Sequence, residues 1–68
     1  MNEEALNTAL RQFLKVVGIT SQREMEKAIR KAIADGRLKG SETLSAKVVL
    51  TLDKVGLTHT IDGTIELQ

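Results

Sequence analysis

The hydrophobic residues of this 68-residue chain change their spacing near residue 40. Before that point they recur every three or four residues, which is typical of one face of an α-helix. From residue 44 onward they alternate with polar residues, which is typical of a β-strand. Because helices and strands repeat their side chains at different periods, the chain needs both structures. The sequence therefore predicts an α+β fold, with helices first, strands second and a loop around residues 36–43.

A first amphipathic helix is predicted at about residues 3–17. Its apolar stripe consists of Leu6, Leu10, Phe13, Leu14 and Val17. Asn2 is a residue type that accepts hydrogen bonds from the first free amides of a helix. Gly18 can adopt the left-handed conformation that ends a helix, so we expect the first helix to end there.

A second helix is predicted at about residues 21–35. Ser21 and Glu24 have the spacing of a capping box, in which each side chain satisfies a free amide at the helix start. The apolar stripe of this helix consists of Met25, Ala28, Ile29, Ala32 and Ile33. Gly36 follows the stripe and is a usual helix terminator. The short connection between the two helices favours a helical hairpin.

Two strands are predicted at about residues 44–52 and 57–67, and their register depends on the turn between them. A two-residue turn at Asp62-Gly63 would mix apolar and polar side chains on both faces. A four-residue loop at residues 53–56 instead gathers the apolar side chains on one face. The expected pairs are Leu52 with Leu57, Leu50 with His59, Val48 with Ile61, Ala46 with Gly63, Leu44 with Ile65 and, on the other face, Lys47 with Asp62. We therefore expect a β-hairpin with the longer loop.

The predicted architecture is α-α-β-β, with two amphipathic helices packed on one face of a two-stranded antiparallel hairpin in a single domain of residues 1–68. Two strands alone are marginal in water, and their outer edges carry unpaired backbone groups that another chain can bind. The uncovered side of the hairpin would expose Val49, Thr51, Thr58 and Thr60. These four residues form a candidate protein interface for a second copy or another protein, although a solvated face explains them too. Both a monomer and a homodimer fit this architecture.

The second predicted helix also carries a basic face. It consists of Arg23, Lys27, Arg30 and Lys31. Like charges four residues apart on a helix are mildly destabilising, so this face is not optimised for helix stability alone. Nucleic-acid binding through this face is therefore the alternative function. The formal net charge of +1, from 10 basic and 9 acidic residues, favours neither nucleic acid nor an anionic membrane as partner.

The sequence offers little material for catalysis. It contains no cysteine, and His59 is the only histidine, so neither a thiolate metal site nor a cysteine–histidine pair can form. The five glycines are too far apart for a phosphate-binding loop. We therefore expect no enzyme, no cofactor, no metal site and no catalytic residue. No apolar run approaches the ~20 residues that cross a bilayer, so we expect a cytoplasmic protein without a membrane partner.

Residues 6–24, LNTALRQFLKVVGITSQRE, and residues 56–67, GLTHTIDGTIEL, carry a resemblance in overall sequence character. The chain resembles a family of short bacterial proteins classed as a domain of unknown function. The resemblance implies a small cytoplasmic bacterial protein without an assigned activity, and it transfers no functional residues. The unfinished two-stranded sheet, rather than the resemblance, leads us to expect a small non-enzymatic interaction module that binds a second copy of itself or another protein through an exposed sheet edge.

Overall fold

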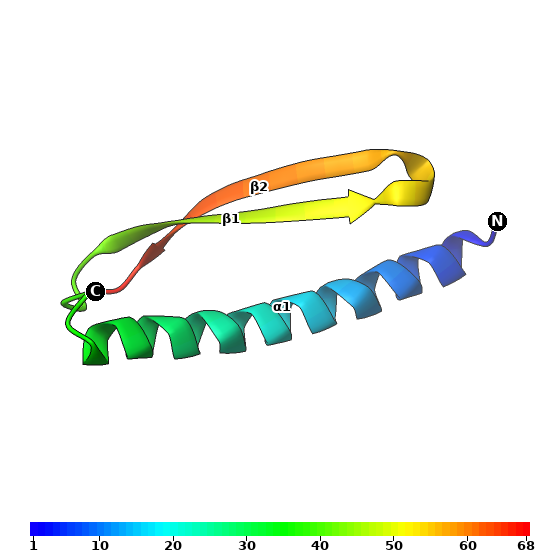
Figure 1. Cartoon of the computed structure of the whole chain (residues 1–68). Coiled ribbons are helices and arrows are strands. Elements are labelled where there is room, and N and C mark those ends of the chain that lie inside the picture. Colours follow the sequence, from blue (N-terminus) through cyan, green and yellow to red (C-terminus); the bar gives the residue numbers. More distant parts are fainter. The chain divides into compact units, whose positions relative to one another are not determined.

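One α-helix and one β-hairpin make up the chain, as a computed structural model of residues 1–68 shows (Figure 1). The elements are helix α1 at Glu3–Ala34, strand β1 at Thr43–Leu52, the 3₁₀ turn η1 at Asp53–Val55 and strand β2 at Leu57–Glu66. The helix belongs to one unit, Met1–Arg37, and the hairpin to another, Leu38–Gln68. The predicted α+β class is confirmed, and the single domain expected for residues 1–68 stays a prediction.

Helix α1 is capped by hydrogen bonds at both ends. The Asn2 side chain accepts a bond of 3.1 Å from a backbone amide of the first turn, as the sequence predicts. At the other end, the Gly36 N–H donates to the Ile33 carbonyl at 3.1 Å and the Arg37 N–H donates to the Ala32 carbonyl at 2.9 Å. With Gly36 at a φ of 81°, these bonds form a Schellman motif. The predicted helix end near Gly36 is confirmed.

The two helices predicted at residues 3–17 and 21–35 are in fact one continuous helix of 32 residues. The prediction of a break at Gly18 is wrong, because Gly18 does not adopt the positive φ of a helix cap. The predicted capping box of Ser21 and Glu24 is wrong as well. Both residues lie in the helix interior, and a Glu24 carboxylate oxygen lies 3.1 Å from Lys27 Nζ in an ion pair.

The helix continues through Gly18 because a break there would destabilise the chain more than an interior glycine does. A glycine inside a helix costs about 1 kcal/mol relative to alanine, whereas a break creates two new helix ends with free amides and carbonyls. The apolar stripe also continues across this region. Leu6, Val17 and Ala28 follow one another at intervals of 11 residues, a spacing that keeps them on one face of a straight helix.

The hairpin has the register that the sequence predicts. Strands β1 and β2 are antiparallel, and every expected cross-strand pair is present, including Val48 with Ile61 and Lys47 with Asp62. Strand β1 begins one residue before the predicted start, and β2 ends one residue before the predicted end. The alternative turn at residues 62 and 63 is excluded, since both residues lie inside β2.

The four-residue loop between the strands depends on one glycine. Residues Asp53–Val55 form a single 3₁₀ turn, and the Gly56 N–H donates to the Asp53 carbonyl at 3.1 Å. Gly56 has a φ of 68°, in the left-handed region where a side chain is unfavourable. The loop returns the chain so that Leu52 pairs with Leu57, and this first pair sets the register of all the others.

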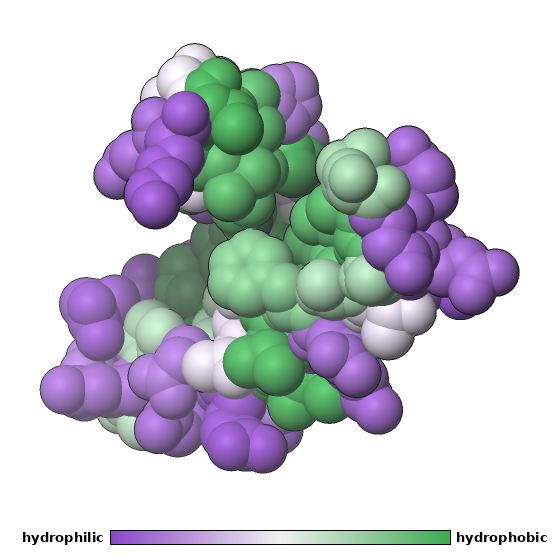
Figure 2. Space-filling view, turned by 90° about the vertical axis from the view of Figure 1, so that its right-hand side faces the viewer, coloured by the Kyte–Doolittle hydropathy of each residue, from purple (hydrophilic) through white to green (hydrophobic).

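The chain buries little of its hydrophobic surface. Ala32 is the one buried residue, with 8% of its surface exposed. Large apolar side chains remain exposed in both units, for example Phe13 at 55% in α1 and Ile61 at 54% in β2. Hydrophobic residues, green in Figure 2, accordingly reach the molecular surface. Neither unit by itself therefore encloses a core of large apolar side chains.

Replacing Gly18 with alanine tests the continuous helix. A Cβ at Gly18 would meet nothing within 4 Å, so Gly18→Ala should raise the free energy of unfolding by roughly 0.5–1 kcal/mol. Gly56→Ala is the matched control and should destabilise the protein, because Gly56 has a positive φ. Urea unfolding followed by circular dichroism measures both effects. Destabilisation by Gly18→Ala would contradict an uninterrupted helix.

Candidate interaction surfaces

The predicted interface residues lie together on one face of the hairpin. The register places Val49 opposite Thr60 and Thr51 opposite Thr58, as two neighbouring cross-strand pairs. All four side chains are exposed, and Val49 keeps 54% of its surface accessible. The polar face to which they belong consists of Thr43, Ser45, Lys47, Val49, Thr51, Thr58, Thr60, Asp62, Thr64 and Glu66. The structure thus brings the four residues together, and their role as an interface stays a prediction.

The opposite, apolar face of the hairpin carries most of its hydrophobic side chains. It consists of Leu44, Ala46, Val48, Leu50, Leu52, Leu57, His59, Ile61, Gly63 and Ile65. His59 is paired with Leu50 on this face, as predicted, and its side chain makes no hydrogen bond or ion pair within the chain. Its neighbours are hydrocarbon rather than carboxylate or hydroxyl groups, which leaves His59 without a partner that could orient it as a base.

Both outer edges of the hairpin are unpaired, because β1 and β2 form a sheet of only two strands. In an antiparallel pair, residues that bond across the pair alternate with residues whose N–H and C=O groups point away. The Leu67 N–H donates to the Glu42 carbonyl at 3.0 Å, which fixes the phase of this alternation. Counting from that bond, the free edge groups belong to the odd-numbered residues of β1 and the even-numbered residues of β2. These are the residues of the polar face.

The helix carries a second exposed apolar surface. Along the stripe, Leu10 is 45% exposed and Leu14 is 56% exposed. Val16 and Ile19 lie outside the stripe, and Ile19 points roughly 160° from its centre at about 100° per residue. The predicted helix end at Gly18 would have left Ile19 outside a helix, so this position arises only because the helix is continuous.

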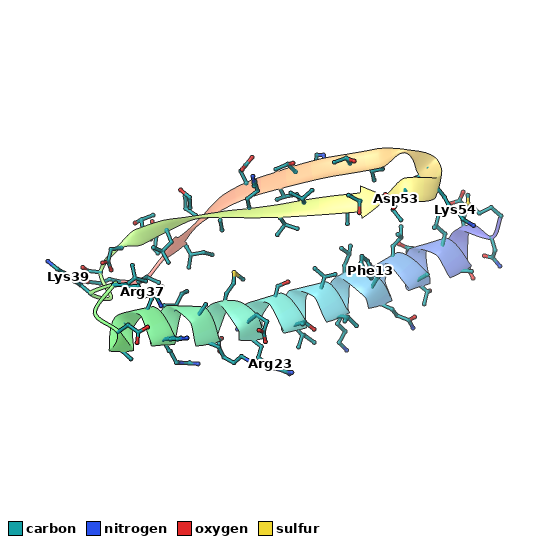
Figure 3. All side chains as sticks on the ribbon, viewed as in Figure 1. Phe13, Arg23, Arg37, Lys39, Asp53 and Lys54 are labelled. Atoms are coloured by element: carbon teal, nitrogen blue, oxygen red, sulfur yellow. The ribbon has the colours of Figure 1, made fainter.

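The basic face lies in the second half of α1, where all four of its side chains are exposed. Lys27 Nζ lies 3.1 Å from a Glu24 carboxylate oxygen, and an Arg30 guanidinium nitrogen lies 3.6 Å from a Glu26 carboxylate oxygen. Arg23 and Lys31 have no ion-pair partner. Neutralisation by the two glutamates therefore leaves Arg23 and Lys31 as the free cations of this face. Figure 3 shows all side chains and labels Arg23 on α1.

The most highly bonded carboxylate of the chain is Glu42, a residue that no sequence motif singles out. Its oxygens accept hydrogen bonds of 2.9 to 3.2 Å from the backbone amides of Lys39, Gly40 and Ser41. These bonds, led by the one from Lys39, lower the pKa of the Glu42 carboxyl group below its ordinary value. The segment lies at the open end of the hairpin, marked by Lys39 in Figure 3, while Asp53 and Lys54 mark its turn.

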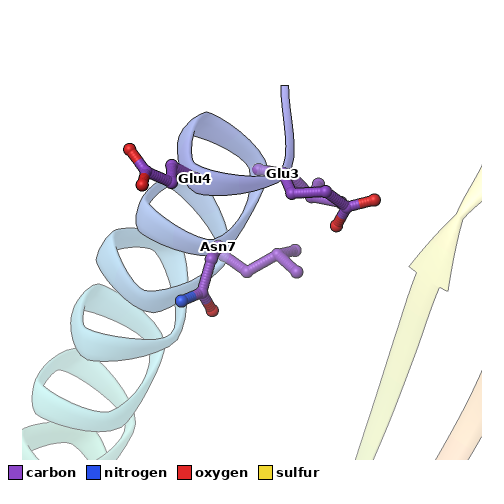
Figure 4. Close-up of a pocket in the computed structure, with 5 residues that line it drawn as sticks. Glu3, Glu4 and Asn7 are labelled. Carbon is purple, nitrogen blue, oxygen red and sulfur yellow. The ribbon is translucent and has the colours of Figure 1, made fainter. Parts of the chain in front are cut away.

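Two depressions of the surface are each formed by a single stretch of helix. One lies at the start of α1 and is lined by Glu3, Glu4, Leu6, Asn7 and Leu10. In Figure 4 the carboxylates of Glu3 and Glu4 point away from one another. Another is lined by Ile19, Gln22, Arg23 and Glu26. No group of three or more histidine, cysteine, aspartate or glutamate side chains is placed to hold a metal ion.

Residues 1–68 match a family of unknown function, DUF6494. The chain belongs to this family. The resemblance inferred from residues 6–24 and 56–67 is thereby confirmed as far as membership of a domain of unknown function is concerned. No curated protein matches the chain, and no solved structure matches it. Helix α1 lacks the apolar character that a bilayer crossing requires.

The hydrogen bonds of Glu42 predict a pH-dependent stability. Because the folded state lowers the pKa of this carboxyl, its stabilising effect is complete above the ordinary glutamate pKa and disappears as the pH falls through the lowered value. The melting temperature should therefore drop more in wild type than in Glu42→Gln between neutral and acidic pH. Glu66→Gln, which removes a carboxylate without backbone hydrogen bonds, is the control. Equal pH profiles for wild type and Glu42→Gln would contradict this role.

Proposed function

We propose that this protein is a non-enzymatic interaction module that self-associates through its β-hairpin. The observation that carries the proposal is the two-stranded sheet, whose ten-residue strands both have a free edge. Such an edge presents a row of N–H and C=O groups that pair readily with a strand of another chain. The chain has neither proline within the strands nor an edge bulge, two devices that commonly prevent this pairing.

The small number of strands in the sheet supports the same proposal. An isolated two-stranded hairpin is at best marginally stable in water, and three or more strands with a covered face are normally needed. Pairing two hairpins edge to edge would create a four-stranded sheet and a wider apolar face. This edge-to-edge pairing leaves the polar face of the wider sheet, with Val49, Thr51, Thr58 and Thr60, free.

The composition of the polar face also fits a protein partner better than a substrate. Its centre carries valine and threonine, residue types that favour extended strands and pack well on a pleated surface. None of its hydroxyl, carboxylate or ammonium groups makes a side-chain hydrogen bond or ion pair that would orient it as an acid, base or nucleophile. A bacterial origin and a cytoplasmic location, both inferred from the sequence, are also part of the proposal.

Nucleic-acid binding is a second candidate, through Arg23, Lys27, Arg30 and Lys31. The observation in its favour is the continuous helix, which holds Arg23 and Lys31 on one exposed side without ion-pair partners. Against it stand the ion pairs of Lys27 and Arg30 with glutamates of the same helix. Self-association is therefore the function that the geometry supports best.

Blocking both edges tests self-association. Sedimentation equilibrium should show the mass rising with concentration above the 7.5 kDa of one chain. Val49→Pro combined with Thr60→Pro removes one outward N–H from each edge and leaves the bonds between β1 and β2 intact. This double variant should weaken association at least about tenfold, which is about 1.4 kcal/mol. The exchange Val49→Thr with Thr60→Val keeps all backbone groups and should associate like wild type. A strict monomer at every concentration would refute the proposal.

A salt series tests the nucleic-acid candidate. If the basic face binds phosphates, titration of a labelled DNA duplex should show binding at low salt that weakens steeply as salt rises. Arg23→Gln with Lys31→Gln should reduce the slope of log K against log salt by about 1 for each phosphate that is no longer neutralised. Arg11→Gln with Lys15→Gln, which removes two cations elsewhere on α1, is the control. Absence of binding at low salt would eliminate this candidate.

A further inference from the structure

The two free edges differ in charge. The edge groups of β1 belong to Thr43, Ser45, Lys47, Val49 and Thr51, among which Lys47 is the only charged residue. Those of β2 belong to Thr58, Thr60, Asp62, Thr64 and Glu66, which include two carboxylates. Like charges on directly opposed strands are destabilising. Two β2 edges would place four carboxylates in one interface, although none is directly opposite another when the axis lies at Ile61, whereas two β1 edges place only two ammonium groups there.

When the β1 edges of two copies pair antiparallel, a two-fold axis relates the copies. The residue at which this axis lies decides whether the two Lys47 side chains face and repel each other. An axis at Lys47 would place the two lysines directly opposite each other. An axis at Val48 instead places Lys47 opposite Val49 of the second copy and Ser45 opposite Thr51 of the second copy, so no charge faces its like. Only backbone groups that are free in the hairpin are used in this arrangement, because all four residues are odd-numbered positions of β1.

The same axis also aligns the apolar residues of β1. Val48 is the midpoint between Leu44 and Leu52, the first and last apolar-face residues of the strand. An axis there pairs Leu44 with Leu52 of the second copy, Ala46 with Leu50 and Val48 with itself. Moving the axis to Val49 would carry Leu44 beyond the strand, opposite the turn residue Lys54. The corresponding alignment of two β2 strands about Ile61 pairs His59 with Gly63, which offers less contact.

We propose that the partner of this hairpin is a second copy of the chain, paired antiparallel along the β1 edge with the two-fold axis at Val48. The product is a four-stranded sheet in the order β2-β1-β1-β2 in a closed dimer, with the two-fold symmetry that is commonest among protein oligomers. This inference rests on the proposed self-association and adds the edge, the register and the symmetry. The apolar face of the sheet then runs without interruption from one hairpin to the other.

Single proline substitutions identify the edge. Val49 and Thr60 are cross-strand partners, and the N–H of each points outward from its own edge. Val49→Pro should raise the dissociation constant at least about tenfold, while Thr60→Pro should leave it within about twofold of wild type. The reverse pattern would show pairing through β2 and overturn the inference. Weakening by both substitutions, together with unlimited growth of mass, would show open-ended β1–β2 pairing and overturn it as well.

Cysteine cross-linking identifies the register. The chain has no cysteine, so each variant carries a single thiol. Across an axis at Val48 the two Cα atoms would form a non-hydrogen-bonded pair about 4.5 Å apart, within the range of a disulfide. Val48→Cys should therefore give a covalent dimer on mild oxidation, whereas Ile61→Cys, its cross-strand partner, should remain monomeric in denaturing electrophoresis.

The outcomes separate the two proposals. A wild-type monomer at all concentrations refutes self-association itself. Association that survives both single proline variants and gives no Val48→Cys dimer refutes the β1 edge while self-association stands, and it assigns the contact to another surface. Association with a Val48→Cys dimer and sensitivity to Val49→Pro alone supports the edge, the register and the closed symmetry together.

Discussion

The pairing of Leu52 with Leu57 across the loop is the interaction on which the rest of the hairpin depends. Because successive side chains of a strand point to opposite faces, this first pair fixes the face of every later residue. The left-handed Gly56 allows a loop of four residues, and a loop shorter by one would move the whole apolar series to the other face. The division into a polar and an apolar face therefore originates in one backbone position.

The same parity explains why the hairpin could be predicted from the sequence and the helix only partly. Apolar and polar residues alternate over many positions, and the loop at residues 53–56 gives a register that keeps the apolar residues on one face. This loop could therefore be predicted from the sequence, and the structure has it. Gly18 and Ser21 offered a local signal for a helix break, but a local signal competes with the cooperativity of a long helix. The sequence does contain a sign of a continuous helix, because Leu6, Val17 and Ala28 repeat every 11 residues. This repeat is not visible when only spacings of three and four residues are compared.

For the candidate surfaces, the sequence predicts which residues share a face of the hairpin or the helix, but it does not predict the hydrogen bonds made by loop residues. The grouping of Val49, Thr51, Thr58 and Thr60 follows from parity alone, and the structure places them as expected. The bonds from the amides of residues 39–41 to Glu42 depend on the path of a loop, which residue types do not determine. The ion pairs of Lys27 with Glu24 and of Arg30 with Glu26 join residues three and four positions apart, a spacing at which helical side chains are neighbours.

The free edges and the exposed apolar surface are two aspects of one unfinished structure. In a two-stranded sheet, half of the backbone N–H and C=O groups form hydrogen bonds only with water. The apolar face of such a sheet is also too narrow to bury a full layer of side chains. Adding strands solves both problems at once, because the new backbone bonds and the wider apolar face arise from the same act of pairing. Under the proposed self-association, folding and association are coupled, as in obligate homodimers whose stability depends on protomer concentration. Under this proposal the β1 edge completes the sheet as well as binding the second copy, and β1 contains neither a proline nor a bulge that would block the pairing.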